Sequence, residues 1–241
     1  MEAPFSEKQI VYEDNHLIII NKLPSQIVQG DKTGDLCLAD LIKDYLKRKY
    51  NKPGNVFCGV VHRLDRPVSG LVIFSKTSKA LSRLNEQIKR HEIRKTYWAV
   101  VKNAPPKPED TLTDFLLRNE KQNKSYVVRE GTDGAKEAIL HYRTLGKSDG
   151  GYYLLEVDLQ TGRHHQIRAQ LANIGCPIKG DLKYGFPRSN ADASISLHAR
   201  YLDFQHPVGK APIHLQGDVP QGSIFEVFGE WSRDEGRRSG V

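Results

Sequence analysis

Residues 59–76 read GVVHRLDRPVSGLVIFSK, a polar loop set between two apolar segments. Pro67 disfavours helical backbone at Arg66, so the polar residues form a loop rather than a helical turn. Gly70 then allows a tight turn into the apolar run Leu71–Lys76, which is predicted to be a strand. The stretch therefore predicts a buried strand with a charged loop at its start.

Hydrophobic periodicity on both sides of this stretch predicts hairpins and single helices. The expected strands are Ile10–Tyr12, Leu17–Asn21, Thr96–Lys102, Ala138–Leu145, Tyr152–Leu159, Tyr201–Phe204 and Ile224–Phe228. The expected helices are Leu38–Leu46 with Asp35 as its cap, Ala80–Ile88, and a third that carries Ile167, Leu171 and Ile174 and stops at Gly175. This mixture favours an α+β fold over a doubly wound parallel sheet.

No internal repeat or low-complexity linker divides the chain, so we expect one domain over residues 10–232. An N-terminal extension, 1–9, precedes it, and a disordered tail, 233–241, follows. Asn103–Asp110 contains three prolines and must be a loop. The polar, charged segment Arg118–Lys136 is expected to be a mobile excursion from the domain.

Composition excludes several classes of protein. The 241 residues are 38% hydrophobic and 27% charged, which is typical of a globular protein and argues against disorder. The apolar runs are far shorter than the ~20 residues that a membrane helix needs, and the first residues do not resemble a signal peptide. Three widely spaced cysteines argue against a disulfide framework or a zinc–cysteine site and indicate a reducing cytoplasm.

The chain is mildly basic. Lysine and arginine number 36 against 29 acidic residues, which gives a net charge of +7. The basic residues cluster at Lys43–Lys52 and at Arg83–Lys95. Charge alone leaves two interpretations open, a solvated surface and a contact with nucleic acid.

Asp65 is the most unusual position in the sequence, because Arg63 and Arg66 lie close on either side of it. A carboxylate among guanidinium groups stays ionised and can act as a nucleophile or a base. The residues alone also allow a structural salt bridge on a turn, and both interpretations stay open at this point.

A second polar cluster, Arg163, His165, Gln166 and Arg168, lies at the start of a predicted helix. Arg168 can pair there with a carboxylate from elsewhere in the fold, and helix N-terminal amides suit a phosphate. Ordinary capping and surface roles stay open. Because HExxH, GxSxG and glycine-rich phosphate motifs are absent from the sequence, we expect chemistry centred on Asp65, with neither metal nor cofactor.

Five ordered motifs resemble the RluA-type RNA pseudouridine synthases, over residues 10–228. They are His62–Asp65 followed by Ser69–Leu71, Arg94–Val100, Thr161–Arg168, Gly180–Gly185, and Leu197–Ala199 with Phe204, His206 and Pro207. The sequence departs from the family at Val68, where Thr is usual. Because the resemblance begins near residue 10, we also expect no S4-like RNA-binding module of the kind that many relatives carry.

The resemblance implies a single catalytic domain of the α+β class, with a mixed, mainly antiparallel central sheet flanked by helices and loops, and a catalytic cleft across the sheet. It implies that Asp65 is the nucleophile, that Tyr97 packs on the target base and takes a sugar proton, and that Arg168 holds and neutralises Asp65. Arg63 would enter the RNA stack where the target uridine has left. The other expected substrate-binding residues are His62, Leu64, Arg163, His165, Gln166 and Ile167.

The implied activity is isomerisation of uridine to pseudouridine in structured RNA, ribosomal or transfer, by a cytoplasmic monomer with no membrane partner and no obligate protein partner. The target base must be flipped out of the stack. Two other classes stay open, a non-catalytic RNA-binding module and a cofactor-free RNA or nucleoside hydrolase. The product separates the three: isomer, nothing, or free uracil.

Overall fold

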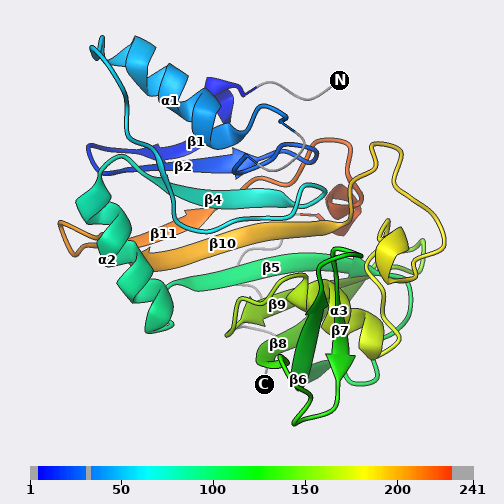
Figure 1. Ribbon diagram of the computed structural model, residues 1–241. Helices are drawn as coiled ribbons and strands as arrows, with labels where there is room; N and C mark the ends of the chain where they lie inside the picture. Colours follow the sequence, from blue (N-terminus) through cyan, green and yellow to red (C-terminus); the bar gives the residue numbers. More distant parts are fainter. Residues whose placement is uncertain (1–4, 31–33, 230–241) are drawn as a thin grey trace. The chain divides into compact units, whose positions relative to one another are not determined.

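The structure, a computed structural model, describes residues 5–30 and 34–229 (Figure 1). The chain divides into two compact units. Unit 1 comprises residues 1–94 and 199–218, and unit 2 comprises residues 95–198 and 219–241. Residues 1–4 of the expected extension and the whole expected tail, 233–241, lie outside the described residues.

In unit 1 the strand order is β1-β2-β4-β10, with β3 beside β4 and β11 beside β10. The bounds are β1 Ile10–Glu13, β2 Leu17–Lys22, β3 Gly59–Val60, β4 Ser69–Ser75, β10 Leu197–Gln205 and β11 Pro212–Gln216. The predicted hairpin of β1 and β2 is confirmed. Asp14 shapes its turn, because its Oδ1 accepts hydrogen bonds from the backbone N–H groups of His16 and Leu17, each at 2.7 Å.

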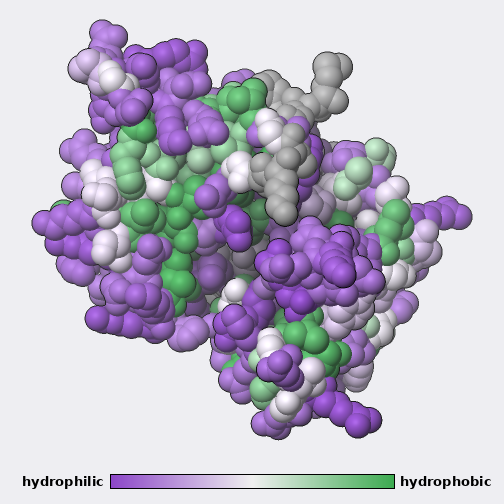
Figure 2. Space-filling model, viewed as in Figure 1, coloured by the Kyte–Doolittle hydropathy of each residue, from purple (hydrophilic) through white to green (hydrophobic). Residues whose placement is uncertain are grey.

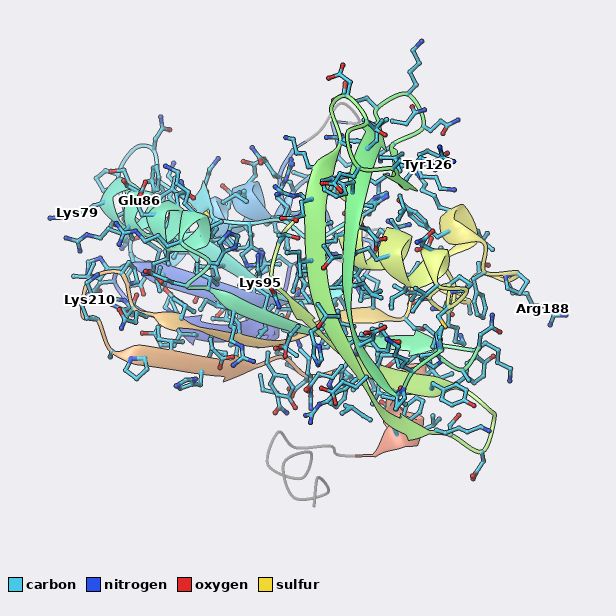
Figure 3. The ribbon with its side chains drawn as sticks, turned by 90° about the horizontal axis from the view of Figure 1, so that it is seen from below. Lys79, Glu86, Lys95, Tyr126, Arg188 and Lys210 are labelled. Carbon is cyan, nitrogen blue, oxygen red and sulfur yellow. The ribbon has the colours of Figure 1, made fainter. Side chains whose placement is uncertain are left out.

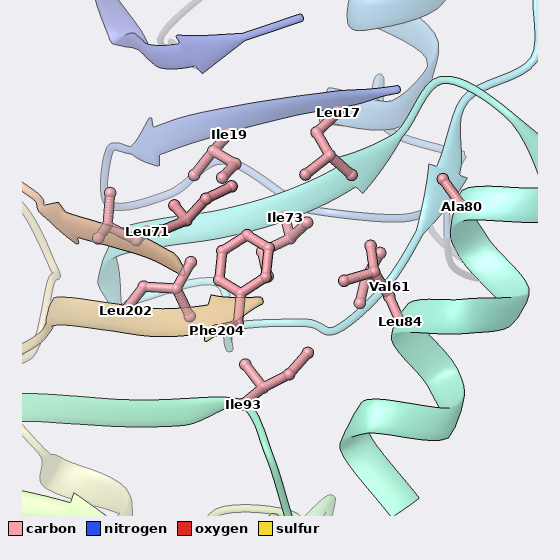
Figure 4. Close-up of a cluster of buried hydrophobic side chains, with 11 residues drawn as sticks. Leu17, Ile19, Val61, Leu71, Ile73, Ala80, Leu84, Ile93, Leu202 and Phe204 are labelled. Carbon is pink, nitrogen blue, oxygen red and sulfur yellow. The ribbon is translucent and has the colours of Figure 1, made fainter. Parts of the chain in front are cut away.

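Two α-helices and an apolar cluster complete unit 1. After a short 3₁₀ turn, Glu7–Gln9, the unit contains α1, Leu38–Lys49, and α2, Ser78–Lys89, both at predicted positions. Ala80 and Leu84 of α2 pack against side chains from the strands (Figure 4). The buried cluster consists of Leu17, Ile19, Val61, Leu71, Ile73, Ala80, Leu84, Ile93, Leu202, Phe204 and Ile213.

Gly70 sets how closely β4 approaches β10. Its φ of +115° is a backbone conformation that residues with a side chain rarely adopt. A Cβ on Gly70 would lie 2.7 Å from the Cα of Ala199, and closer still to the backbone nitrogen and oxygen of that residue. Glycine is therefore required here for two separate reasons, conformation and space.

In unit 2 the strand order is β5-β9-β8-β6-β7, and all of these neighbours pair antiparallel. The bounds are β5 Arg94–Val101, β6 Glu109–Asn119, β7 Lys124–Val128, β8 Lys136–Lys147 and β9 Tyr153–Leu159. The predicted hairpin of β8 and β9 is confirmed. Helix α3, Gln166–Asn173, covers one face of these strands, where its Ala169 packs with Leu116 of β6 and Ala138 of β8.

The expectation of a mobile excursion at Arg118–Lys136 is wrong. The segment contains the end of β6, all of β7 and the start of β8. Asn119 Oδ1 accepts a hydrogen bond from the Gln122 N–H at 3.1 Å in the turn between β6 and β7. The polar composition has a structural reason, because β7 is the last strand in its order and outer strands commonly carry charged side chains.

Ile224–Phe228 is a 3₁₀ helix rather than the expected strand. Phe225 is buried beside Trp98, with ring centroids 6.5 Å apart, whereas Val227 is exposed. One aromatic side chain therefore anchors the segment. The other expected strands and helices are present, and the α+β fold, with mainly antiparallel strands and three α-helices, is confirmed. None of the described helices is long and apolar enough to cross a membrane.

Glu13, at the end of β1, accepts hydrogen bonds from four side chains in and near α1. Its carboxylate accepts hydrogen bonds from the hydroxyls of Tyr45 and Tyr50, at 2.9 and 2.7 Å. It also accepts from the amines of Lys49 and Lys76, at 2.8 and 2.9 Å. Burial raises the pKa of this carboxyl, but the four donors outweigh burial and lower the pKa of Glu13 to about 2.

We expect Gly70→Ala to lower the free energy of unfolding by about 2–4 kcal/mol, because the new Cβ collides with backbone that cannot rotate away. Urea denaturation measures this. The matched control is Gly54→Ala, which also has positive φ but open space around its Cβ, and which should lose only about 1–2 kcal/mol to backbone strain. Equal losses for the two variants would remove the steric explanation.

The acid stability of unit 1 should depend on Glu13. Between pH 4.5 and about 2 the unfolded chain takes up a proton at this residue and the folded protein does not, so stability is lost as the pH falls through that range. Glu13→Gln should be less stable at pH 7 and lose less on acidification, as measured by urea unfolding at each pH. Glu86→Gln, which removes an exposed partner of Lys89 on α2, should change neither value measurably.

Candidate active site

Asp65 lies in a loop of unit 1 that is fixed by backbone and core contacts. The Asp65 carbonyl accepts a hydrogen bond from the Val68 N–H at 3.0 Å, which closes a turn. On the other side Leu64 is buried, and His62 Nε2 accepts a hydrogen bond from the Ile73 N–H of β4 at 3.3 Å. The half-buried Asp65 side chain is therefore carried on a loop anchored before and after it.

Three residues of this loop are expected to bind substrate, and they differ in their surroundings. Arg63 is exposed. Leu64 belongs to the core, and His62 bonds to β4, so their observed contacts support the loop. Substrate binding by all three stays a prediction.

Lys22 is a candidate that the sequence analysis missed. It ends β2, has no exposed surface, and lies opposite Gly70 in the register of β2 with β4. Its Nζ donates hydrogen bonds to the carbonyls of Leu23 and Arg66, at 2.9 and 3.1 Å. Burial lowers the pKa of Lys22 to about 7, while the Asp65 carboxylate raises it and the Arg66 guanidinium lowers it. The available signal was a lysine at the end of an apolar strand.

Arg66 forms an ion pair with Asp35, with 2.9 Å between Nη1 and Oδ2. The expectation that Asp35 caps α1 is therefore wrong. The N-cap is Cys37, which makes no side-chain capping bond. Because both members of the Arg66–Asp35 pair are partly exposed, the pair contributes at most about 1 kcal/mol to stability.

Tyr97 lies on the face of the unit 2 strands that α3 covers. Strand pairing places Tyr97 opposite Val157, and Val157 opposite Tyr142. Tyr142 shares a face with Ala138, four residues earlier in β8, and Ala138 packs with α3. Tyr97 is 6% exposed. The strand register therefore puts Tyr97 on the same side of the sheet as Arg168.

Arg168 is held by Asp181 within unit 2. Its Nε and Nη2 donate to the two carboxylate oxygens, at 2.6 and 2.9 Å, and both side chains are buried. The guanidinium carbon also lies 5.1 Å from the centre of the Tyr184 ring, a cation–π contact. The sequence predicts a carboxylate partner for Arg168, and the structure provides one in Asp181, which lies in the Gly180–Gly185 motif but is not among the predicted site residues. The pairing with Asp65 stays a prediction.

Gln166 shapes the loop before α3. Its Oε1 accepts hydrogen bonds from the Thr161 hydroxyl and the Arg163 N–H, at 2.8 and 3.0 Å, and its Nε2 donates to the Ile139 carbonyl at 3.1 Å. Arg163 Nε donates to the Glu137 carbonyl at 2.8 Å. The observed contacts of Gln166 and Arg163 are thus within the protein, and their expected binding of substrate stays a prediction.

His165 is the N-cap of α3 and has a φ of +53°, a conformation that few residues other than glycine adopt. Its ring stacks on His164 at 3.8 Å, and its Nδ1 lies 3.1 Å from the Tyr184 hydroxyl. Burial, aided by the charge of Arg168, lowers the pKa of His165 to about 2, so the ring is neutral at physiological pH. His165 and the buried Ile167 therefore fix the start of the helix that carries Arg168.

The candidate residues provide three chemical groups. Unit 1 contributes the half-buried carboxylate of Asp65, and unit 2 contributes the phenol of Tyr97 and the guanidinium of Arg168, which Asp181 holds in place. Such groups suit nucleophilic and acid–base chemistry. Within residues 5–30 and 34–229, no group of three or more His, Cys, Asp or Glu side chains is placed to hold a metal ion.

Two curated relatives match most of the chain. The tRNA pseudouridine synthase C of Pectobacterium carotovorum subsp. carotovorum is 29% identical over 92% of this chain and 62% of its own length. The ribosomal large subunit pseudouridine synthase D of Xylella fastidiosa is 33% identical over 88% of this chain and 66% of its own length. The chain thus spans slightly less than two thirds of these relatives.

The solved structure of human RNA pseudouridylate synthase domain containing 4 has a similar fold. The TM-score is 0.74 at 23% sequence identity, and the match covers 89% of each chain. Residues 16–173, more than half of this chain, match the sequence profile of the RNA pseudouridylate synthase family. That range includes Asp65, Tyr97 and Arg168. The resemblance seen in the sequence is therefore confirmed, and the chain belongs to the RNA pseudouridylate synthase family.

Proposed function

We propose that this chain isomerises specific uridines to pseudouridine in structured RNA. The observation that carries the proposal is the Asp65 loop, in which a half-buried carboxylate follows a segment anchored in the core. The buried Lys22 supports this loop by donating a hydrogen bond to the carbonyl of Arg66. Two relatives are named for transfer RNA and for the large ribosomal subunit. Both classes of RNA are therefore candidate substrates.

In the proposed reaction the Asp65 carboxylate attacks C1′ of the target uridine, or assists elimination to a glycal, as the N1–C1′ bond breaks. The uracil turns and C5 bonds to C1′, which breaks the Asp65–C1′ bond and frees the carboxylate or, on the glycal route, is balanced by return of the sugar proton to C2′. C5 then loses its proton, and N1 gains one. Substrate and product are isomers, so atoms and electrons balance without an oxidant, a reductant or water. In this proposal the ring of Tyr97 packs on the target base, and its hydroxyl transfers the sugar proton.

C1′ and C5 of a stacked nucleotide are out of reach of a side chain, so the nucleotide must leave the helix at a cost of a few kcal/mol. Arg63 is exposed and precedes Asp65 by two residues on the same loop. We propose that the Arg63 side chain enters the RNA stack and fills the space that the flipped base leaves. Filling that space offsets part of the unstacking cost.

Exposed basic residues on α1 and α2 supply the proposed phosphate contacts. They include Lys47 and Arg48 of α1, Lys89 of α2, and Arg90, the C-cap of α2. Hydrophilic residues cover the ends of both helices in the view of Figure 2, and Figure 3 marks Lys79 on α2. Contacts to phosphate position an RNA without reading its sequence, so these residues should affect affinity more than the choice of uridine.

The proposal includes a cytoplasmic monomer without a cofactor, and the three free cysteines fit a reducing compartment. Purified protein incubated with transfer RNA and ribosomal RNA tests the function directly. Chromatography of the digested nucleosides should show pseudouridine, and chemical mapping should place it at defined positions. Release of free uracil would identify a hydrolase, and unchanged RNA that is nevertheless bound would identify a binding module.

Asp65→Asn should lower turnover by about 10⁴- to 10⁶-fold, the scale of losing a catalytic nucleophile, with RNA affinity largely kept. The amide preserves shape and removes charge and nucleophilicity. Single-turnover assays and equilibrium binding measure the two effects. Asp133→Asn, at an exposed position, should change neither. Turnover of Asp65→Asn within tenfold of the parent enzyme would reject the nucleophile assignment.

Arg168→Met should lower the free energy of unfolding by about 3–5 kcal/mol, because it leaves the buried Asp181 carboxylate without its cation. The double variant Arg168→Met/Asp181→Leu should regain most of that stability. If Arg168 also acts on the reaction, the double variant stays inactive although it is stable. Recovery of both stability and turnover would limit Arg168 to a structural role.

A further inference from the structure

Lys95 is a lone ammonium on an otherwise apolar row of side chains. It lies at the start of β5, where Figure 3 marks it. In the strand register Lys95 is opposite Leu159 of β9, Leu159 is opposite Leu140 of β8, and Leu140 is opposite Leu112 of β6. Paired residues point to the same face of a sheet, so a single positive charge ends a row of three leucines.

No described residue of unit 2 compensates this charge. Within the described parts of the chain, the side chain of Lys95 makes no hydrogen bond and no ion pair, and only its backbone pairs with β9. The nearby carboxylate in β9 belongs to Asp158, which lies opposite Thr96 and accepts a hydrogen bond from the Thr96 hydroxyl at 2.6 Å. Asp158 therefore points to the other face. Burial alone lowers the pKa of the half-buried Lys95, so the folded protein bears a desolvation cost with no partner to offset it.

On one side, the amine of Lys95 faces a glycine rather than a side chain. Its Nζ lies 3.7 Å from the position that a Cβ on Gly162 would take. Gly162 belongs to the loop that Gln166 shapes before α3, and the missing side chain leaves the amine uncovered on that side. Lys95 also shares its face of β5 with Tyr97, two residues further on, a spacing of about 7 Å along a strand.

We infer that Lys95 binds a backbone phosphate of the RNA, adjacent to the nucleotide whose base packs on Tyr97. This inference rests on the proposed function, because it takes RNA as the ligand. A phosphate supplies the missing negative charge in a setting where an ion pair is little screened. It also keeps the amine protonated on binding. Lys95 is thus a substrate-binding residue, distinct from the exposed lysines of α1 and α2.

Binding and stability together test this role without any turnover. Lys95→Met, Lys95→Arg and Lys102→Met are each made in the Asp65→Asn protein. Lys102 is the matched control, because it follows β5 at the other end, carries the same charge, and already donates to the Gly150 carbonyl at 2.7 Å. The probes are unfractionated transfer RNA and a ribosomal RNA transcript, each titrated at several salt concentrations.

We expect Lys95→Met to weaken binding of at least one probe about tenfold, and to lower the slope of log affinity against log salt by ~0.7–0.9, the value for one phosphate contact. Lys95→Arg should keep most of the slope, and Lys102→Met should keep all of it. The melting temperature of Lys95→Met should stay the same or rise, because an uncompensated charge leaves an apolar row. A structural lysine would give the opposite change.

Wild-type slopes for Lys95→Met with both probes would overturn the inference. Unchanged slopes together with lost turnover, measured with Asp65 restored, would assign the amine to proton transfer and also reject a phosphate contact. Should Lys95→Met fail to fold, Lys95→Gln replaces it in the same comparison. Absence of pseudouridine with the wild-type enzyme would refute the proposed function alone, since the slopes are measured without catalysis.

Discussion

The close contact between the backbones of Gly70 and Ala199 is the constraint on which unit 1 depends. It fixes where β4 can begin, because no other residue fits both the φ angle and the space. The turn that carries Asp65 ends immediately before this point. Lys22, opposite Gly70, then reaches the carbonyl of Arg66. A contact between two main chains thus helps to set the position of the loop that carries the carboxylate.

Buried charges in both units have partners within the protein, with one exception. Glu13 has four donors, Lys22 has two carbonyls, and Arg168 has both oxygens of Asp181. Each of these groups is satisfied within the protein, which suits a structural role. Lys95 departs from this rule. Proteins keep a charged side chain that is partly buried without a partner where function requires it. The missing partner, more than the charge itself, distinguishes Lys95 from Lys22.

Local patterns in the sequence are enough to predict the hairpins β1–β2 and β8–β9, and the charged loop before β4. The outer hairpin of β6 and β7 escapes prediction because a strand at the end of the order needs little apolar alternation. The roles of Asp181 and Lys22 cannot be predicted from the sequence for another reason. Their partners are distant in the sequence or are backbone atoms, and only the folded chain brings them together.

Unit 1 is assembled from two separate stretches of the chain, which orders the events of folding. Residues 199–218, which supply most of β10 and all of β11, emerge only after the strands of unit 2 have been synthesised. Closing Gly70 on Ala199 requires a loop of ~130 residues, and contacts of such long range form slowly. During synthesis the apolar surface of β2 and β4 therefore stays exposed until β10 has been made. Aggregation can compete with folding in this N-terminal part of the nascent chain.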